Sequence, residues 1–146
     1  MVNFIIKEKV RTEEIEEIYK LETLCYQAPW SKSFFHSCLQ DCIFFVAYNK
    51  DNGIVGFICG KEIGDIGCIY NLAVHPSFRR MGIATALLRK FIEKAEHDGV
   101  KEIWLEVKRS NFPAISLYKK FNFEIIGLRK KYYSDGEDAY LMNLKI

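Results

Sequence analysis

The feature that most constrains the fold of this chain is an apolar run at residues 68–74 that leads through a short turn into a long periodic helix. The helix is predicted from about Gly82 to Asp98, and Gly99 is well placed to end it. A second strand is predicted at Glu102–Val107, where alternate residues are apolar. A strand, a crossover helix and a second strand in one sheet form a parallel strand pair. The sequence therefore predicts a β–α–β unit at the centre of the chain.

The start of this helix has the composition of a phosphate-binding site. Gly82 and Ala84 have small side chains, which let a ligand approach the backbone closely. Arg79 and Arg80 stand just before them and can form charge-assisted bonds with phosphates. The first N–H groups of a helix are unpaired and lie at the positive end of its dipole. We therefore expect a phosphate or pyrophosphate group to bind at this turn.

Further elements are predicted on both sides of the central unit. The expected order is β, α, α, three β, α, β, α and two β, which predicts a single α/β (α+β) domain over residues 1–146. Its sheet is mixed and mostly antiparallel, with helices on both faces. The outer elements are strands at 4–10, 43–48, 54–62, 67–74, 123–132 and 139–145, helices capped by Thr12 and Ser31 around a break at 28–31, and a short helix opened by Pro113.

Composition and charge exclude several classes of protein. The net charge is only +2, from 21 basic and 19 acidic residues, whereas a dedicated nucleic-acid binder has a strong basic excess. No apolar run approaches the length of a membrane span, and the N-terminal segment becomes charged too early for a secretory signal. The five cysteines lack metal-ligand spacing, so we expect free thiols in a cytoplasmic protein that holds no metal. The chain is expected to be a monomer or a weak dimer that binds neither nucleic acid nor membranes.

Two common phosphate-binding motifs do not occur, namely the Walker loop and the dinucleotide fingerprint after the first strand. Instead the chain has Arg79-x-x-Gly82-x-Ala84, which resembles the Arg/Gln-x-x-Gly-x-Gly/Ala signature of the GNAT N-acetyltransferases. The order of the predicted elements resembles the same family over essentially the whole chain. The resemblance implies acetyl-coenzyme A as cosubstrate. It also implies these residues for binding its pyrophosphate and pantetheine arm: Leu72, Ala73, Val74, Arg79, Arg80, Met81, Gly82, Ile83, Ala84, Thr85 and Asn111.

Other segments resemble the RimI-type protein-alanine N-acetyltransferases within that family. They are Pro29-Trp30-Ser31, the stretch from Leu105 to Phe123, and the segment around Tyr132-Tyr133-x-Asp135-Gly136. This resemblance implies acetylation of the N-terminal amine of a protein, an alanine of a ribosomal protein such as S18. The chain departs from the family pattern at Ala84, a position usually glycine, and at Asn122, where Asn can also adopt a positive φ.

Two residues are expected to move protons. A neutral α-amine attacks a thioester, so a base must collect its proton, and a carboxylate ending an apolar strand suits that task. Glu106 is such a residue and matches the general base of the family, acting directly or through a water molecule. Tyr118 matches the general acid that protonates the departing thiolate. Taken alone, Glu106 also fits a solvated strand end, Tyr118 a core tyrosine and Asn111 a helix cap.

Four aromatic residues are expected near the acceptor: Tyr26, Trp30, Tyr132 and Tyr133. In this fold the loops that carry them border the acceptor groove, although packing of loop against core explains them equally well. Acidic residues of the last turn, Glu137 and Asp138, either attract the ammonium group of the acceptor or are solvated. A GNAT enzyme for a small amine and a non-catalytic domain that binds acetyl-coenzyme A remain alternative functions.

Overall fold

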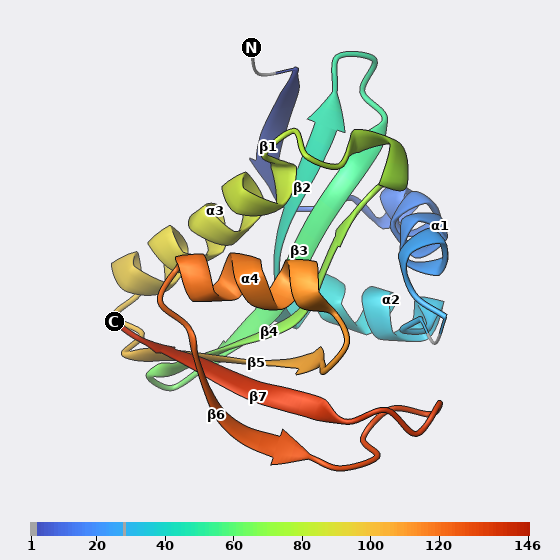
Figure 1. Ribbon diagram of the computed structural model, residues 1–146. Coiled ribbons are helices and arrows are strands. Elements are labelled where there is room, and N and C mark those ends of the chain that lie inside the picture. Colours follow the sequence, from blue (N-terminus) through green and yellow to red (C-terminus); the bar gives the residue numbers. More distant parts are fainter. Residues whose placement is uncertain (1–2, 28) are drawn as a thin grey trace.

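The computed structural model describes residues 3–27 and 29–146, and its strands form one seven-stranded sheet in the order β1-β2-β3-β4-β5-β7-β6 (Figure 1). Only β4 and β5 pair in parallel, and the five other pairs are antiparallel. The predicted mixed sheet with a central β–α–β unit is therefore confirmed. Its strands are β1 (Phe4–Glu8), β2 (Ile43–Asn49), β3 (Ile54–Ile63), β4 (Ile66–Val74), β5 (Glu102–Lys108), β6 (Glu124–Arg129) and β7 (Ala139–Lys145).

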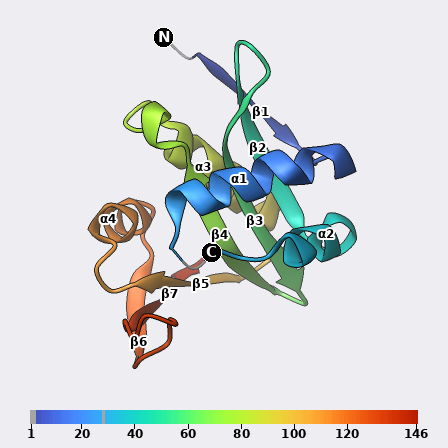
Figure 2. The same cartoon turned by 90° about the vertical axis from the view of Figure 1, so that its right-hand side faces the viewer.

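Helices cover both faces of the sheet, as Figures 1 and 2 show. The long helix α3 and the short helix α4 lie on one face, and α1 and α2 lie on the other. None of the helices among residues 3–27 and 29–146 is long and apolar enough to cross a membrane. The helices are α1 (Ile15–Cys25), α2 (Lys32–Asp41), α3 (Ile83–His97) and α4 (Phe112–Lys120), with short 3-10 helices η1 (Thr12–Glu14) and η2 (Pro76–Phe78).

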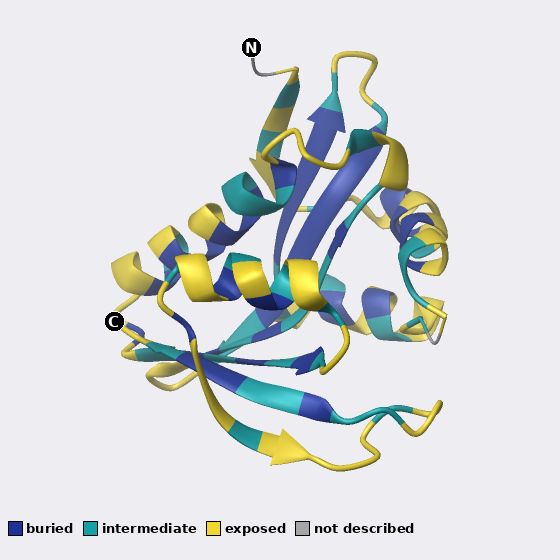
Figure 3. Cartoon of the chain, in the orientation of Figure 1, coloured by how far each residue is buried: buried dark blue, intermediate teal, exposed yellow. Residues whose placement is uncertain are grey.

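The sheet separates two apolar cores, which Figure 3 shows as buried bands along the strands and helices. Strand residues alternate between them because successive side chains point to opposite faces. On β5, Ile103 and Leu105 join the core beneath α3 and α4, as their alternation predicts. The buried face of α3 is the predicted one: Leu87, Leu88, Phe91, Ile92 and Ala95.

The parallel strands β4 and β5 separate after a short paired segment. Pairing ends at Ile69 and Leu105, so the C-terminal parts of the two strands have unpaired edges toward each other. We call these diverging edges, residues 70–74 of β4 and 106–108 of β5, the wedge. On its other side β4 pairs with β3, and their register shifts between Cys59 and Gly60, which indicates a bulge just before the wedge.

The ends of several elements differ from prediction for local reasons. Ser31 caps α2 as predicted, with its hydroxyl oxygen accepting from Phe34 N at 3.1 Å. Thr12 is not a cap: it begins η1, where the carboxylate of Glu14 accepts from Arg11 N at 2.8 Å. The last strands are joined by a longer loop than predicted, because β6 ends at Arg129. Ala28, part of the predicted helix break, lies outside the described residues.

Candidate active site

Along β4, the backbone N–H and C=O groups of every second residue point into the wedge. His75 N donates to Val55 O on β3 at 2.8 Å. Backbone groups of successive strand residues point in opposite directions, so those of Leu72 and Val74 point away from β3 and into the wedge. The backbone groups of Ala73 face β3, and its side chain is buried in the core of α1 and α2. Leu72 and Val74, two of the three residues expected to hold the pantetheine arm, thus direct their backbone groups into the wedge, where Leu72 N already donates to the side-chain oxygen of Asn71 at 2.9 Å.

Helix α1 contacts this edge directly. The Tyr26 hydroxyl, just after α1, donates to Leu72 O at 2.5 Å. The Cys25 thiol donates to Val74 O at 3.3 Å. Burial raises the pKa of Tyr26 well above its ordinary value, so its hydroxyl stays a neutral donor. The side chains of Cys25 and Tyr26 therefore hold the end of α1 against the wedge by bonding the backbone of β4.

The turn after β4 has the backbone that a pyrophosphate site needs. Arg80 and Gly82 both have left-handed backbones, with φ of 63° and 83°. Gly82 is the N-cap of α3, and beyond its chain neighbours no atom lies within 4 Å of the position where a side-chain carbon would stand. The first turn of α3 therefore opens onto free space beside Arg79 and Arg80, which are both exposed. This geometry fits a pyrophosphate bound by backbone N–H groups and by two cations.

The other predicted residues of this turn are arranged in different ways. The side chain of Ile83 is buried in the core, so only its backbone is available to a ligand. Met81 is exposed, while Ala84 and Thr85 are half-buried in the first turn of α3. Asn111 caps α4, with its side-chain oxygen accepting from Ala114 N at 3.3 Å. The helix-cap role of Asn111 is thus present, and its side-chain oxygen is already engaged.

Glu106 lies at the wedge end of β5, on the face away from α3 and α4. Ile103 and Leu105 belong to the core on that side, and Glu106 alternates with them. The Tyr132 hydroxyl donates to its Oε1 atom at 3.2 Å. Arg129 Nε lies 2.6 Å from its Oε2 atom, an ion pair that sequence reasoning did not predict. The carboxylate is thus held in place from β6 and the loop that follows β6.

Tyr118 lies on the opposite face, buried beneath α4. Its ring packs in the core of α3 and α4 and contacts Phe123, with ring centroids 5.6 Å apart. Burial raises the pKa of Tyr118, so the phenol keeps its proton near neutral pH. Burial and then the nearby charge of Glu106 raise the pKa of Tyr133 to about 12. The chain therefore has a carboxylate on one face of the sheet and a neutral phenol on the other.

The aromatic residues predicted near the acceptor differ in their surroundings. The ring of Trp30 is partly exposed and stacks on Phe34, with centroids 4.3 Å apart. Tyr132 and Tyr133 pack edge to face in the loop between β6 and β7, with centroids 5.1 Å apart. Each of these rings therefore packs against a neighbouring aromatic ring, while Trp30 and Tyr132 also keep exposed surface that an acceptor could contact. Tyr26 has the additional bond to β4 described above.

The acidic residues of the last loop are engaged within the protein. Glu137 accepts from Ser110 N at 2.8 Å, and Asp138 forms an ion pair with Arg109 at 3.4 Å. Asp135 forms another with Lys108 at 2.7 Å. These contacts fasten the β6–β7 loop to the end of β5. The three carboxylates therefore have partners within the protein, and Asp135 is also exposed to solvent.

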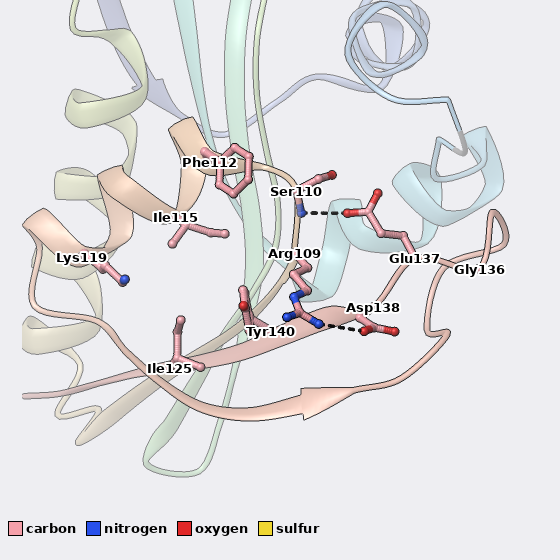
Figure 4. A pocket seen from close by; sticks show the side chains of 10 residues that line it. All are labelled: Arg109, Ser110, Phe112, Ile115, Lys119, Ile125, Gly136, Glu137, Asp138 and Tyr140. Atoms are coloured by element: carbon pink, nitrogen blue, oxygen red, sulfur yellow. Dashed lines mark hydrogen bonds and ion pairs between the residues drawn. The ribbon is translucent and has the colours of Figure 1, made fainter.

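A cavity of about 710 Å³ lies elsewhere, between α4 and the β6–β7 strands (Figure 4). Phe112, Ile115 and Lys119 of α4 line it, together with Ile125 and Tyr140 of the strands. It includes neither of the residues predicted for catalysis and none predicted for acetyl-coenzyme A, but Glu137 and Asp138 line it. Glu106 lies outside it, on the β5 edge of the wedge.

Comparison with known proteins agrees with this geometry. The family model described as the acetyltransferase (GNAT) family matches residues 15–123. The chain belongs to the GNAT family of acetyltransferases. An N-alpha-acetyltransferase of Sulfolobus acidocaldarius is 53% identical to it over 88% of this chain and 85% of that protein. The [ribosomal protein bS18]-alanine N-acetyltransferase of Escherichia coli is 32% identical over 94% of this chain and 95% of that protein.

A solved structure extends the likeness to the fold of this acetyltransferase. The crystal structure of the ribosomal-protein-S18-alanine N-acetyltransferase from Escherichia coli superposes with a TM-score of 0.90 at 32% identity. The match covers 98% of this chain and 94% of that one. The resemblance to the RimI-type enzymes, first seen in short motifs, is therefore confirmed over the whole length.

Sequence reasoning missed three polar residues beside the wedge of this acetyltransferase: Glu22, Asn71 and Arg129. Glu22 follows Ile18 by four residues, so it lies on the apolar stripe of α1, where a charged residue is unusual. Asn71 is likewise a polar residue within an apolar strand. A polar residue within an apolar stripe or strand indicates a buried polar contact, so the sequence alone could have identified Glu22 and Asn71. Arg129 gave no such signal, because β6 is exposed along most of its length.

Proposed function

We propose that this acetyltransferase moves the acetyl group of acetyl-coenzyme A to the N-terminal α-amine of a protein, by direct attack in a ternary complex. The observation that carries the proposal is that Glu106, at the wedge end of β5, and Tyr118, in the core of α3 and α4, lie on opposite faces of the sheet. A thioester lying in the wedge has a proton acceptor on one face and a proton donor on the other. This is the arrangement that acyl transfer to an amine requires.

In the proposed reaction each residue has one role. The α-amine has an ordinary pKa near 8, so part of it is neutral at pH 7. Its nitrogen attacks the thioester carbonyl carbon, and Glu106 accepts the proton that the nitrogen loses, directly or through a water molecule. The C–S bond then breaks, and the leaving thiolate takes a proton from the Tyr118 hydroxyl. The products are a protein whose α-amine has become an acetamide and free coenzyme A. The proton that Glu106 accepted is released to solvent, and Tyr118 regains one from solvent, which restores the enzyme.

Binding of acetyl-coenzyme A is assigned to the wedge and the turn beyond it. The Val74 N–H group and the carbonyl oxygens of Leu72 and Val74, each of which can accept a second bond, match the amides of a pantetheine arm, which can pair like a strand. Arg79, Arg80 and the N–H groups that open α3 are suited to the pyrophosphate. Ala73 contributes to the neighbouring core, and Asn111 shapes the start of α4.

The acceptor is proposed to be an N-terminal alanine, on a ribosomal protein such as S18. The relative from Escherichia coli has this activity in its name, and the one from Sulfolobus acidocaldarius is named for N-alpha-acetylation without a stated residue. Trp30, Tyr132 and Tyr133 are assigned to the acceptor, together with Tyr26, which bonds the β4 edge of the wedge. The free thiols of all five cysteines are compatible with a reducing cytoplasm as the place of action.

Mass spectrometry of peptides incubated with the enzyme and acetyl-coenzyme A tests the proposal. A peptide that begins Ala-Arg should gain one acetyl group at its α-amine. The same peptide with a blocked N-terminus and a lysine side chain should gain none, and polyamines should react far more slowly. Transfer to small amines without transfer to any peptide α-amine would show that the acceptor assignment is wrong. Binding of coenzyme A without any turnover would instead favour a non-catalytic domain.

A further inference from the structure

Glu22 is the most deeply buried carboxylate that the proposed reaction does not use. Its residue is only 1% exposed, near the end of α1 and against β4. No lysine or arginine in residues 3–27 and 29–146 forms an ion pair with it. The titratable groups that face it are Cys25 and Tyr26 at the end of α1 and Cys59 on β3. A buried carboxylate with no cation is costly, so its contacts need an explanation.

Each oxygen of this carboxylate accepts from a different segment of the chain. Oε2 accepts from Trp30 N, in the loop between α1 and α2, at 3.0 Å. Oε1 accepts from the side-chain nitrogen of Asn71 on β4. The side-chain oxygen of Asn71 in turn accepts from Leu72 N at 2.9 Å. Glu22 thus connects the loop assigned to the acceptor with the strand edge assigned to acetyl-coenzyme A.

The direction of these bonds requires a carboxylate at position 22. Trp30 N is a donor, and the Asn71 nitrogen must be a donor as well, since its oxygen serves Leu72 N. Only a side chain with two acceptor atoms satisfies both contacts. A glutamine would accept from one donor and place its own N–H group against the other. Burial raises the pKa of Glu22 to about 7, which reflects the cost of keeping this acid in the interior.

We propose that Glu22 is a positioning residue that holds the Trp30 loop and the Leu72 edge of β4 in a fixed relation, so that the acceptor amine and the thioester meet in the wedge. It touches neither substrate and acts through Asn71 and the backbone of Trp30. The inference rests on the proposed function, because it assumes that the Trp30 loop binds the acceptor and that the Leu72 edge of β4 binds acetyl-coenzyme A.

An exchange of amide and carboxylate between positions 22 and 71 tests this role. Above the pKa of Glu22, where the side chain is a carboxylate, Glu22→Gln should lower kcat/KM for a peptide beginning Ala-Arg by about 10-fold or more. The reason is that one bond of a charge-assisted network is replaced by a donor–donor contact. The double variant Glu22→Gln/Asn71→Asp restores every bond, because the carboxylate introduced at position 71 accepts both from the amide introduced at position 22 and from Leu72 N. We expect it to regain kcat/KM to within about 3-fold of wild type.

The matched control is Glu102→Gln, which alters a second hydrogen-bonded Glu–Asn pair, that of Glu102 with Asn143 between β5 and β7. This pair lies at the opposite end of β5 from the wedge, so kcat/KM should stay within about 2-fold. Wild-type kcat/KM in Glu22→Gln would overturn the proposal. So would a double variant that folds but is no more active than Glu22→Gln.

Hydrogen exchange separates this inference from the proposed function. In Glu22→Gln the amides of Trp30 and Leu72 should exchange about 10-fold faster than in wild type, and the double variant should restore their protection. If wild type acetylates no peptide, the proposed function is wrong. The exchange rates of Trp30 and Leu72 still test whether Glu22 holds these two segments together. Unchanged exchange at both amides would overturn the positioning role. Should Glu22→Gln fail to fold, Asn71→Ala must show the same loss, since it removes the two bonds that Asn71 makes to Glu22 and to Leu72 N but leaves the bond from Trp30 N to Glu22.

Discussion

Glu106, the first residue of β5 beyond its pairing with β4, and Tyr118, in the core of α3 and α4, lie on opposite faces of the sheet. Glu106 projects toward the side of α1 and α2 and is held by Arg129 and Tyr132. Tyr118 is packed beneath α4 with its phenol neutral. A substrate that enters between the two strands can be reached from both faces, which a continuous parallel sheet would not allow.

Removing either group should slow the chemistry without preventing cosubstrate binding. We expect Glu106→Gln to lower kcat by about 10²-fold or more, the usual contribution of a general base. Tyr118→Phe should lower kcat by a similar factor, because the leaving thiolate loses its proton donor. Steady-state kinetics with the peptide, together with calorimetric titration of coenzyme A, measures both effects. The suitable control is Glu102→Gln, on the same strand and the same face; an unchanged kcat in Glu106→Gln would contradict the assignment.

Alanine substitution of two glycines with similar backbone geometry should distinguish an effect on acetyl-coenzyme A binding from an effect on folding stability. Gly82 and Gly64 both have positive φ, of 83° and 63°, and free space around them. An alanine at either position should cost about 1 kcal/mol of folding stability, because a side chain disfavours this backbone. Only Gly82→Ala also tilts the start of α3, so only it should raise the Kd for acetyl-coenzyme A, by about 10-fold. Equal Kd values for the two variants would argue against a pyrophosphate at this turn.

A third glycine is required by packing at the bulge before the wedge. A side-chain carbon at Gly60 would overlap the carbonyl oxygen of Cys68 and lie 2.8 Å from the Phe91 ring. Because the backbone of β4 cannot move away freely, we expect Gly60→Ala to lower the free energy of unfolding by about 3 kcal/mol. The same change at Gly67 meets its nearest atom at 3.5 Å, an ordinary contact. Urea unfolding of Gly67→Ala should stay within about 1 kcal/mol of wild type.

The buried acid Glu22 should make stability depend on pH between about 4.5 and 7. Burial raises its pKa in the folded protein from 4.5 to about 7, so the folded state binds this proton more tightly than the unfolded chain. The stabilisation is therefore complete below pH 4.5 and is lost as the pH rises to about 7. The loss amounts to about 3 kcal/mol.

Comparison with Glu22→Gln isolates this effect from other titrating groups. The neighbours Cys25, Tyr26 and Cys59 have raised pKa values and stay neutral throughout the window. The difference in unfolding free energy between wild type and Glu22→Gln should thus fall across this window and level off at higher pH. A constant difference from pH 4 to pH 8 would show that Glu22 does not titrate as described.

Patterns of local origin were predicted well from the sequence. The alternation of β5, the buried stripe of α3 and the Ser31 cap depend on neighbouring residues only, and all are found. The Thr12 cap was wrong because Glu14, drawn inward by Tyr48 of β2, bonds Arg11 instead. The strand before the last loop was predicted too long, since side chains of Asp135 and Asp138 determine that loop. Such contacts depend on partners that are distant in the sequence.

The sequence by itself determined the order of elements, the helices on both faces of the sheet and the glycine turn expected to bind phosphate, because each follows from periodicity or from the small residues at Gly82 and Ala84. It also carried the family, through short motifs. Only the tertiary structure decided that β4 and β5 separate after Ile69 and Leu105, and that Arg129 and Tyr132 hold Glu106. It alone linked Glu22 through Asn71 to the strand edge. Those relations join residues tens of positions apart, and no local pattern of hydrophobicity or propensity encodes which distant side chains will meet.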